Sequence, residues 1–186
     1  MNLPNKLSVA RLLLTPVFVV SVVYHTEANP ILANLPLIVF LTAIATDALD
    51  GFIARKYNQI TSFGILLDPL ADKFLLIVSF ITLSLATTTL PHLRIPPWVL
   101  IIVLTRDLFI LIGAAVIYMV FGYVEFKPSM LGKIATVFQM LTILAVLLRL
   151  DYSGIVWTLA AFFTVVSGIH YLIRTSGLLH GKAKNI

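Results

Sequence analysis

Apolar residues run along this chain in six long stretches separated by short polar segments. The stretches cover residues 8–24, 31–56, 66–86, 97–121, 133–150 and 155–174. Each comes close to or exceeds the roughly 20 residues that an α-helix needs to cross the hydrocarbon core of a bilayer. The segments between them are too short for a second folded domain. The pattern therefore predicts an all-α integral membrane protein, with six transmembrane helices in a single domain that covers residues 1–186.

The composition agrees with this prediction and excludes other classes of protein. Of the 186 residues, 60% are hydrophobic and only 11% are charged, about half the charged fraction of a soluble domain. The chain has no cysteine, which excludes a small secreted scaffold held by disulfides. A net charge of +5 would suggest nucleic acid as the partner of a soluble protein. In a membrane protein such a charge more often reflects loops that face anionic lipids, so we expect no nucleic acid partner.

The basic residues predict how the chain is oriented in the membrane. Residues 2–11 mix Lys6 and Arg11 with apolar residues, which is typical of a short amphipathic helix lying at the interface. Basic residues at the termini and in the two even loops are Lys6, Arg11, Arg55, Lys56, Lys127, Lys133, Arg174, Lys182 and Lys184, against Arg94 and Arg149 on the other side. Because basic residues favour the cytoplasmic side, we expect both termini in the cytoplasm and the protein in the cell (inner) membrane.

Four aspartates lie in or at the ends of the apolar stretches, where a carboxylate costs on the order of a few kcal/mol and usually marks a functional site. Asp47 and Asp50 belong to the second stretch, and Asp68 and Asp72 to the third. The short loop between these stretches makes the two helices antiparallel neighbours, so all four carboxylates can converge on one pocket. Their repulsion calls for a cation. Oxygen ligands without cysteine or a nearby histidine favour Mg²⁺ or Mn²⁺, and we expect two such ions.

Small residues accompany these aspartates on the same helix faces. The helical spacing aligns Asp47, Asp50, Gly51 and Ala54 on one face, and Gly64, Asp68 and Asp72 on another. Small residues there would let a bulky ligand approach the backbone. The alternative is that the glycines serve helix packing and the aspartates cap helices. Pro69 is either the first helical residue, with Asp68 as its cap, or the site of a kink.

The aspartates form part of a longer motif. Residues 47–55 read Asp-Ala-Leu-Asp-Gly-Phe-Ile-Ala-Arg, and residues 64–72 read Gly-Ile-Leu-Leu-Asp-Pro-Leu-Ala-Asp. Together they match all eight fixed positions of the pattern D-x2-D-G-x2-A-R-x8-G-x3-D-x3-D. The chain thus resembles the CDP-alcohol phosphatidyltransferases. The resemblance implies that an alcohol attacks the lipid-side phosphorus of a CDP-linked lipid, usually CDP-diacylglycerol, and that CMP leaves.

The resemblance also implies a role for each residue of the motif. The metal ligands would be Asp47, Asp50, Asp68 and Asp72, and Asp72 would in addition take the proton from the acceptor hydroxyl. Gly51, Ala54 and Arg55 would line the site of the cytidine diphosphate. Members of the family are typically homodimers, so we expect the same here. An ion-coupled transporter remains a remote alternative, because intramembrane aspartates can also relay ions.

Two further positions bear on the acceptor alcohol. Arg106 and Asp107 lie within the fourth stretch, and Lys133 opens the fifth. Because adjacent residues of a helix point about 100° apart, we expect no tight pair between Arg106 and Asp107. Arg106 would then face a ligand, and together with Lys133 next to the carboxylate pocket it would suit an acceptor that carries phosphate. For Lys133 and Lys127 the alternative is the general cytoplasmic bias of basic residues.

Residues 2–11, 131–133 and 163–171 resemble the bacterial phosphatidylglycerophosphate synthases of this family, whose acceptor is glycerol 3-phosphate. Two positions depart from that pattern. Those enzymes usually have Arg-Glu where this chain has Arg106 and Asp107, and a second lysine where it has Ala135. Arg-Asp is more similar to the cardiolipin synthases of the family, which use phosphatidylglycerol. We therefore expect glycerol 3-phosphate as the acceptor, with phosphatidylglycerol as the alternative.

Overall fold

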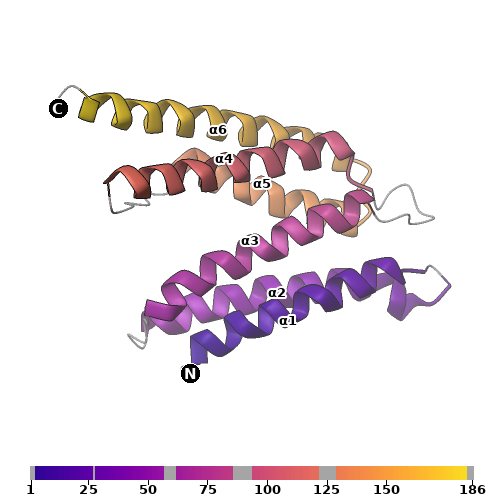
Figure 1. The fold of residues 1–186 in the computed structure, drawn as a ribbon. Coiled ribbons are helices and arrows are strands. Elements are labelled where there is room, and N and C mark those ends of the chain that lie inside the picture. The colour runs from indigo at the N-terminus through magenta and orange to yellow at the C-terminus, as the bar shows by residue number, and fades with distance from the viewer. Residues whose placement is uncertain (1–2, 27, 57–61, 86–93, 122–128, 184–186) are drawn as a thin grey trace. The chain divides into compact units, whose positions relative to one another are not determined.

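The computed structural model describes all but residues 1–2, 27, 57–61, 86–93, 122–128 and 184–186, and the described part consists of helices joined by short turns, with no strand. The helices are α1 (Leu3–Val23), α2 (Pro30–Lys56), α3 (Ser62–Leu85), α4 (Pro97–Phe121), α5 (Met130–Leu147) and α6 (Ser153–Ala183) (Figure 1). Some helical side chains are not described, among them those of residues 50–56 and 62–70. Each predicted apolar stretch corresponds to one helix.

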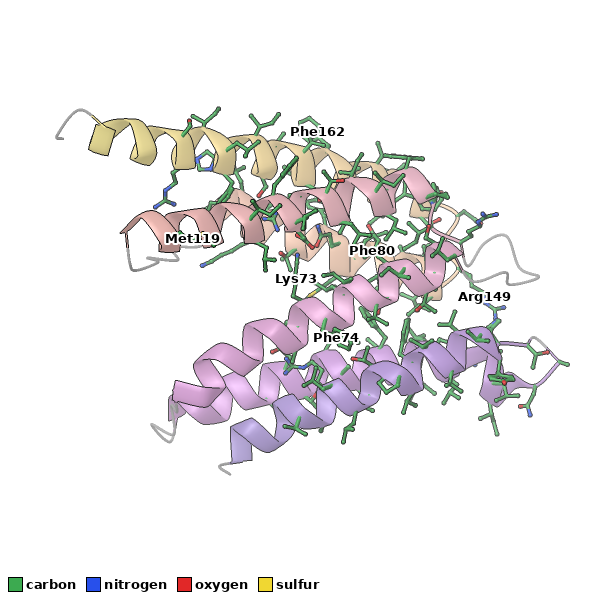
Figure 2. The ribbon with its side chains drawn as sticks, viewed as in Figure 1. Lys73, Phe74, Phe80, Met119, Arg149 and Phe162 are labelled. Carbon is green, nitrogen blue, oxygen red and sulfur yellow. The ribbon has the colours of Figure 1, made fainter. Side chains whose placement is uncertain are left out.

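The predicted membrane crossings are supported for part of the chain. Within the described ranges, α5 and residues Ser153–Arg174 of α6 are long and apolar enough to cross a membrane. Large apolar side chains are also exposed on several helices, for example Phe74, Met119 and Phe162 (Figure 2). Water would disfavour so much exposed apolar surface, whereas lipid would not. The fold therefore suggests a membrane protein, and six crossings remain a prediction.

The first helix differs from the prediction. We expected a short interfacial helix followed by a separate membrane span, but α1 is continuous from Leu3 to Val23. Pro4 falls in the first turn, where its missing N–H would have no helical partner anyway. No glycine follows that would end the helix, and Pro16 lies inside it. The prediction of a separate N-terminal helix is therefore wrong.

The chain divides into two compact units. The first consists of Met1–Ile95 with Val146–Arg149, and the second of Pro96–Ala145 with Leu150–Ile186. In the first unit, α1 packs against both α2 and α3 (Figure 1). Its apolar core includes the fully buried rings of Phe18, Phe40 and Phe80. The ring centroids of the first two lie 5.8 Å apart, so this contact joins α1 to α2.

The second unit is held together by contacts of α6 with α4 and α5. The rings of Phe138 on α5 and Phe163 on α6 stack with their centroids 4.8 Å apart. The hydroxyl of Tyr171 on α6 donates a hydrogen bond of 3.1 Å to the carbonyl of Ile110 on α4. A Cβ atom on Gly113 of α4 would lie 2.8 Å from Cε1 of Tyr171. The glycine is therefore required for this close approach of α4 and α6.

A local motif explains why α5 ends before the predicted boundary at residue 150. The N–H of Leu150 donates to the carbonyl of Ala145, and the N–H of Arg149 donates to the carbonyl of Val146, each at 3.0 Å. These are the two hydrogen bonds of a Schellman cap. Arg149 takes the left-handed position of this cap with a φ of 56°. The helix is thus closed by backbone hydrogen bonds, without the glycine that usually fills this position and would have signalled the end in the sequence.

Candidate active site

A buried arginine joins two of the four motif aspartates in the first unit. Arg11 lies on α1, and its side chain is only 1% exposed. Its Nη2 atom lies 3.0 Å from Oδ1 of Asp47 on α2, and its Nη1 atom donates to Oδ1 of Asp72 on α3. The guanidinium therefore connects all three helices of the unit, and the carboxylates of α2 and α3 converge on one positive charge.

The two carboxylates remain accessible although their partner is buried. The side chain of Asp47 is 36% exposed and that of Asp72 is 33% exposed. An ion or ligand can therefore approach these carboxylates from the side that Arg11 does not cover. A buried arginine is stable only when its charge is compensated, and the two aspartates provide that compensation.

The donor set fits a divalent metal ion. The contacts of Arg11 demonstrate that carboxylate oxygens of Asp47 and Asp72 reach a single cation, and such oxygens are the ligands that Mg²⁺ and Mn²⁺ prefer. Asp50 follows Asp47 by one turn of α2, and Asp68 precedes Asp72 by one turn of α3, so each pair shares a helix face. The side chains of Asp50 and Asp68 lie outside the described part. Among the side chains that are described, no group of three or more His, Cys, Asp or Glu is close enough to hold a metal.

The structure shows that Pro69 lies within a helix, whereas the roles of Gly51, Ala54 and Arg55 remain predictions. Because α3 begins at Ser62, Pro69 lies inside the helix, and the alternative in which Asp68 caps its start is wrong. Gly51, Ala54 and Arg55 belong to α2, but their side chains are not among those described. Their contribution to a cytidine diphosphate site stays a prediction.

Sequence reasoning missed the role of Arg11. We assigned it to an interfacial segment and counted it with the basic residues of the cytoplasmic side, but the structure buries it among three helices. The sequence did contain a signal. Arg11 is followed directly by three leucines in an apolar stretch, and a cation in such a stretch needs an anionic partner.

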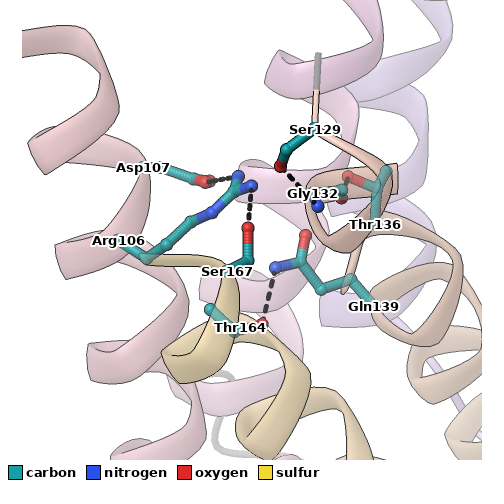
Figure 3. Close-up of polar contacts among 8 residues, drawn as sticks. All are labelled: Arg106, Asp107, Ser129, Gly132, Thr136, Gln139, Thr164 and Ser167. Carbon is teal, nitrogen blue, oxygen red and sulfur yellow. Dashed lines mark hydrogen bonds and ion pairs between the residues drawn. The ribbon is translucent and has the colours of Figure 1, made fainter. Parts of the chain in front are cut away.

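A second polar cluster lies in the other unit and is centred on Arg106 of α4 (Figure 3). Its Nη1 atom donates to Oδ1 of Asp107 at 3.0 Å, and its Nη2 atom donates to Oγ of Ser167 on α6 at 2.9 Å. The side chains of Arg106 and Asp107 are only 11% and 8% exposed. The expectation that these neighbours do not pair is therefore wrong. The long arginine side chain folds back to its neighbour, because burial makes an unpaired charge costly.

Two glycines provide the space for this arginine. A Cβ atom on Gly132 of α5 would lie 3.1 Å from Nη2 of Arg106, and a Cβ atom on Gly168 of α6 would lie 3.4 Å from its Cγ. Ser129 caps the start of α5, since its Oγ accepts a hydrogen bond of 3.0 Å from the N–H of Gly132. The first turn of α5 therefore approaches the guanidinium closely. The helix N-terminus and the arginine together favour an anion, and Asp107 already supplies one at 3.0 Å from Nη1 of Arg106.

Three further residues of α5, namely Gln139, Lys133 and Ala135, differ in burial. Gln139 on α5 is fully buried, and its Nε2 atom donates a hydrogen bond of 3.1 Å to Oγ1 of Thr164 on α6. Its Oε1 atom is buried without a hydrogen-bond partner among the described residues. Lys133 is exposed on the first turn of α5, whereas Ala135 is fully buried. Lys133 directly follows the glycine whose added Cβ would approach Arg106, and its side chain is exposed.

Sequence analysis missed the polar residues of α6. Thr164, Ser167 and Tyr171 recur at the spacing of one helix face, and all three donate or accept hydrogen bonds across the unit. This spacing within an apolar stretch was the available signal. It indicates a polar seam along α6 that faces α4 and α5 rather than lipid.

Comparison with known proteins identifies the family. The family model for CDP-alcohol phosphatidyltransferases matches residues 1–166. This chain belongs to the CDP-alcohol phosphatidyltransferase family. The match confirms the resemblance inferred from the aspartate motif and makes the chain an enzyme of this class. Enzymes of the family generally depend on divalent metal ions, which agrees with the oxygen ligands described above.

Several curated members of the CDP-alcohol phosphatidyltransferase family are similar to this chain over most of its length. CDP-diacylglycerol–glycerol-3-phosphate 3-phosphatidyltransferase of Bacillus subtilis is 34% identical in an alignment of 190 positions that covers 93% of this chain and 94% of the relative. The protein of the same name from Aquifex aeolicus is 38% identical over 146 residues, which cover 78% of this chain and 75% of the relative. A protein of Mycobacterium tuberculosis named probable phosphatidylglycerophosphate synthase is 33% identical over 182 residues, covering 93% and 81%.

Proposed function

We propose that this CDP-alcohol phosphatidyltransferase transfers the phosphatidyl group of CDP-diacylglycerol to glycerol 3-phosphate, giving phosphatidylglycerophosphate and CMP. The observation that carries the proposal is the convergence of Asp47 and Asp72 on one positive charge, within a complete family motif. The choice of acceptor is supported by the relatives from Bacillus subtilis and Aquifex aeolicus, whose names specify glycerol 3-phosphate. The family match extends over both compact units, which supports a single functional domain.

The motif aspartates are proposed to bind two divalent ions, Mg²⁺ or Mn²⁺. The ligands in this proposal are Asp47, Asp50, Asp68 and Asp72. When bound, such ions neutralise the pyrophosphate of the donor and the charge that develops on the departing CMP. The exposure of about one third at Asp47 and Asp72 supports access of ions to the carboxylates.

In the transfer step, the hydroxyl oxygen of the acceptor attacks the lipid-side phosphorus, and the bond from this phosphorus to the CMP oxygen breaks. The carboxylate of Asp72 accepts the hydroxyl proton. Gly51 and Ala54 leave room for the cytidine diphosphate beside α2, and Arg55 contributes a positive charge to that site. The pyrophosphate linkage thereby stays close to the carboxylates that bind the ions.

Arg106 is proposed to bind the phosphate of the acceptor, with support from the first turn of α5. Two of its donor groups are fixed by Asp107 and Ser167, so the guanidinium is held in a defined orientation. The N-terminal end of α5 lies beside it at Gly132 and adds favourable electrostatic potential for an anion. Lys133 follows on the same turn and would add a further charge, in line with its exposed position.

The protein is proposed to span the cell membrane six times, with both termini and the active site on the cytoplasmic side, and to form a homodimer. Without the buried Arg11, eight basic residues lie in the termini and loops of the predicted cytoplasmic side against two on the other, which supports this orientation. The reaction also favours it, since the acyl chains of the donor need lipid whereas glycerol 3-phosphate and CMP need the cytoplasm.

The proposal is tested by measuring CMP release from CDP-diacylglycerol with Mg²⁺, in parallel with glycerol 3-phosphate and with phosphatidylglycerol. We expect turnover with glycerol 3-phosphate alone. Turnover with phosphatidylglycerol alone would instead identify a cardiolipin synthase. Asp72→Asn should abolish CMP release, while Asp151→Asn, which changes an exposed aspartate outside the motif, should not. Normal turnover of the Asp72→Asn protein would contradict the proposed site.

A further inference from the structure

We infer that Arg11 is a built-in counter-ion that competes with divalent cations for Asp47 and Asp72. The inference rests on the proposed metal-binding role of these aspartates and extends it. It assigns to α1 a function in controlling how tightly the site binds its metal. The residue also keeps the carboxylates of α2 and α3 together when no metal is bound.

The positive charge of Arg11 offsets the negative charges of Asp47 and Asp72. Arg11 is buried to 1% exposure, and its guanidinium contacts carboxylates from two different helices. Without a positive charge at this position, Asp47 and Asp72 would repel each other and push α2 and α3 apart. Arg11 therefore compensates part of the negative charge that bound metal ions would also compensate.

Arg11 and a divalent ion would use the same carboxylate oxygens. Arg11 contacts Oδ1 of Asp47 and Oδ1 of Asp72. A divalent ion needs the same carboxylates at bonding distances of about 2.0–2.1 Å for Mg²⁺. Such an ion either takes these oxygens from the guanidinium or binds the remaining oxygens directly beside a positive charge. In both cases the arginine weakens metal binding and the metal weakens the contacts of the arginine, because binding free energies couple reciprocally.

The opposite role for Arg11 makes an opposite prediction. If Arg11 served only to position the carboxylates for the metal, its removal would disorder the ligands and weaken metal binding. If it competes with the metal, removal of its charge tightens metal binding and destabilises only the metal-free protein. The sign of the change in metal affinity therefore separates competition from positioning.

The experiment measures Mn²⁺ binding and thermal unfolding for the full-length protein and its variants in detergent. Free Mn²⁺ is quantified by its electron paramagnetic resonance signal, and unfolding is followed with excess EDTA and with excess Mn²⁺. We expect Arg11→Gln to bind Mn²⁺ about tenfold or more tightly than the wild type, since a positive charge a few ångströms from the ion is removed. Its Tm in EDTA should fall, and Mn²⁺ should raise it by more than it raises the wild-type Tm.

Two variants serve as controls. Arg11→Lys keeps the charge and should bind Mn²⁺ with an affinity close to that of the wild type. Arg94→Gln removes the charge of an exposed arginine of the same unit and should change neither affinity nor Tm. If Arg11→Gln does not fold without metal, it is purified with Mn²⁺ and titrated with EDTA. Release at a higher EDTA concentration than the wild type supports competition, and release at a lower concentration overturns it.

The outcomes also separate this inference from the proposed metal site. If the wild type does not bind Mn²⁺, or if Asp72→Asn leaves its binding unchanged, the proposed metal site is wrong, and the inference about Arg11 fails with it. If the wild type binds Mn²⁺ through Asp72 but Arg11→Gln binds it equally or more weakly, only the competition is overturned.

Discussion

Replacement of Gly132 by alanine is expected to weaken acceptor binding without destabilising the protein. The added Cβ would lie 3.1 Å from Nη2 of Arg106 and 3.1 Å from Oγ of Ser129, so both flexible side chains must shift by a few tenths of an ångström. The shift of Arg106 strains its 2.9 Å hydrogen bond to Ser167. A hydrogen bond to a charged group contributes about 1.5–3 kcal/mol. If about 1 kcal/mol of the free energy of this hydrogen bond no longer supports acceptor binding, the KM for glycerol 3-phosphate rises about fivefold. Alanine favours the helix by up to about 1 kcal/mol, which offsets the strain on the hydrogen bond by which Ser129 caps α5.

The assay is CMP release with each substrate varied while the other is saturating, together with thermal unfolding in the same detergent. Gly154→Ala is the matched control, because its Cβ would lie 3.7 Å from Cζ2 of Trp157, an ordinary contact. We expect this control to keep both KM values, and Gly132→Ala to keep the KM for CDP-diacylglycerol and a Tm at or above that of the wild type. An unchanged acceptor KM in Gly132→Ala, or an equal rise for both substrates, would refute the binding of the acceptor phosphate beside Arg106.

Further expected outcomes concern the metal and the packing of the second unit. EDTA should stop CMP release, and Mg²⁺ or Mn²⁺ should restore it; activity that is indifferent to the chelator would exclude a metal-dependent reaction. Thr164→Val should lower the free energy of unfolding by about 1–3 kcal/mol, because it leaves Nε2 of the buried Gln139 without its partner. Adding Gln139→Leu to this variant should recover part of that loss. Unfolding by urea or heat measures both effects. Gly113→Ala should lower the free energy of unfolding by about 1–3 kcal/mol, because the new Cβ would lie 2.8 Å from Cε1 in the rigid ring of Tyr171. A Tm as high as that of Gly154→Ala would contradict this prediction.

The positions of the helices could be predicted from the sequence because the apolar stretches are long and separated by short polar segments. The helix ends were less predictable. The end of α5 depends on a cap in which Arg149 takes the left-handed conformation, and no glycine marks that position. The continuity of α1 depends on the absence of any stop signal after Pro4, which amphipathic patterning does not report. Hydrophobic pattern therefore locates the helices, whereas local hydrogen bonding fixes where they end.

The composition of the candidate site was only partly predictable. The aspartate motif is read from spacing within two consecutive helices, so Asp47 and Asp72 could be assigned to one cluster. The partner of these aspartates, Arg11, lies on α1, and its contact depends on how three helices pack. The same holds for Ser167, which reaches Arg106 from another helix. Contacts between distant segments are set by tertiary packing, and a single sequence carries no direct record of it.

The buried position of Arg11 has a consequence for how the protein enters the membrane. An arginine at the centre of a membrane-spanning helix costs on the order of 2.5–3.5 kcal/mol during insertion, and Arg11, near the start of the apolar residues Val9–Val23 of α1, carries a smaller part of that cost. If α1 crosses the membrane as proposed, this cost arises when α1 leaves the ribosome, because Asp47 on α2 and Asp72 on α3 are synthesised only afterwards. We therefore expect α1 to be stable in the lipid only once its carboxylate partners are present. The helices of the first unit would then enter the lipid together, and the ion pairs that join them would link the order of synthesis to the assembly of the active site.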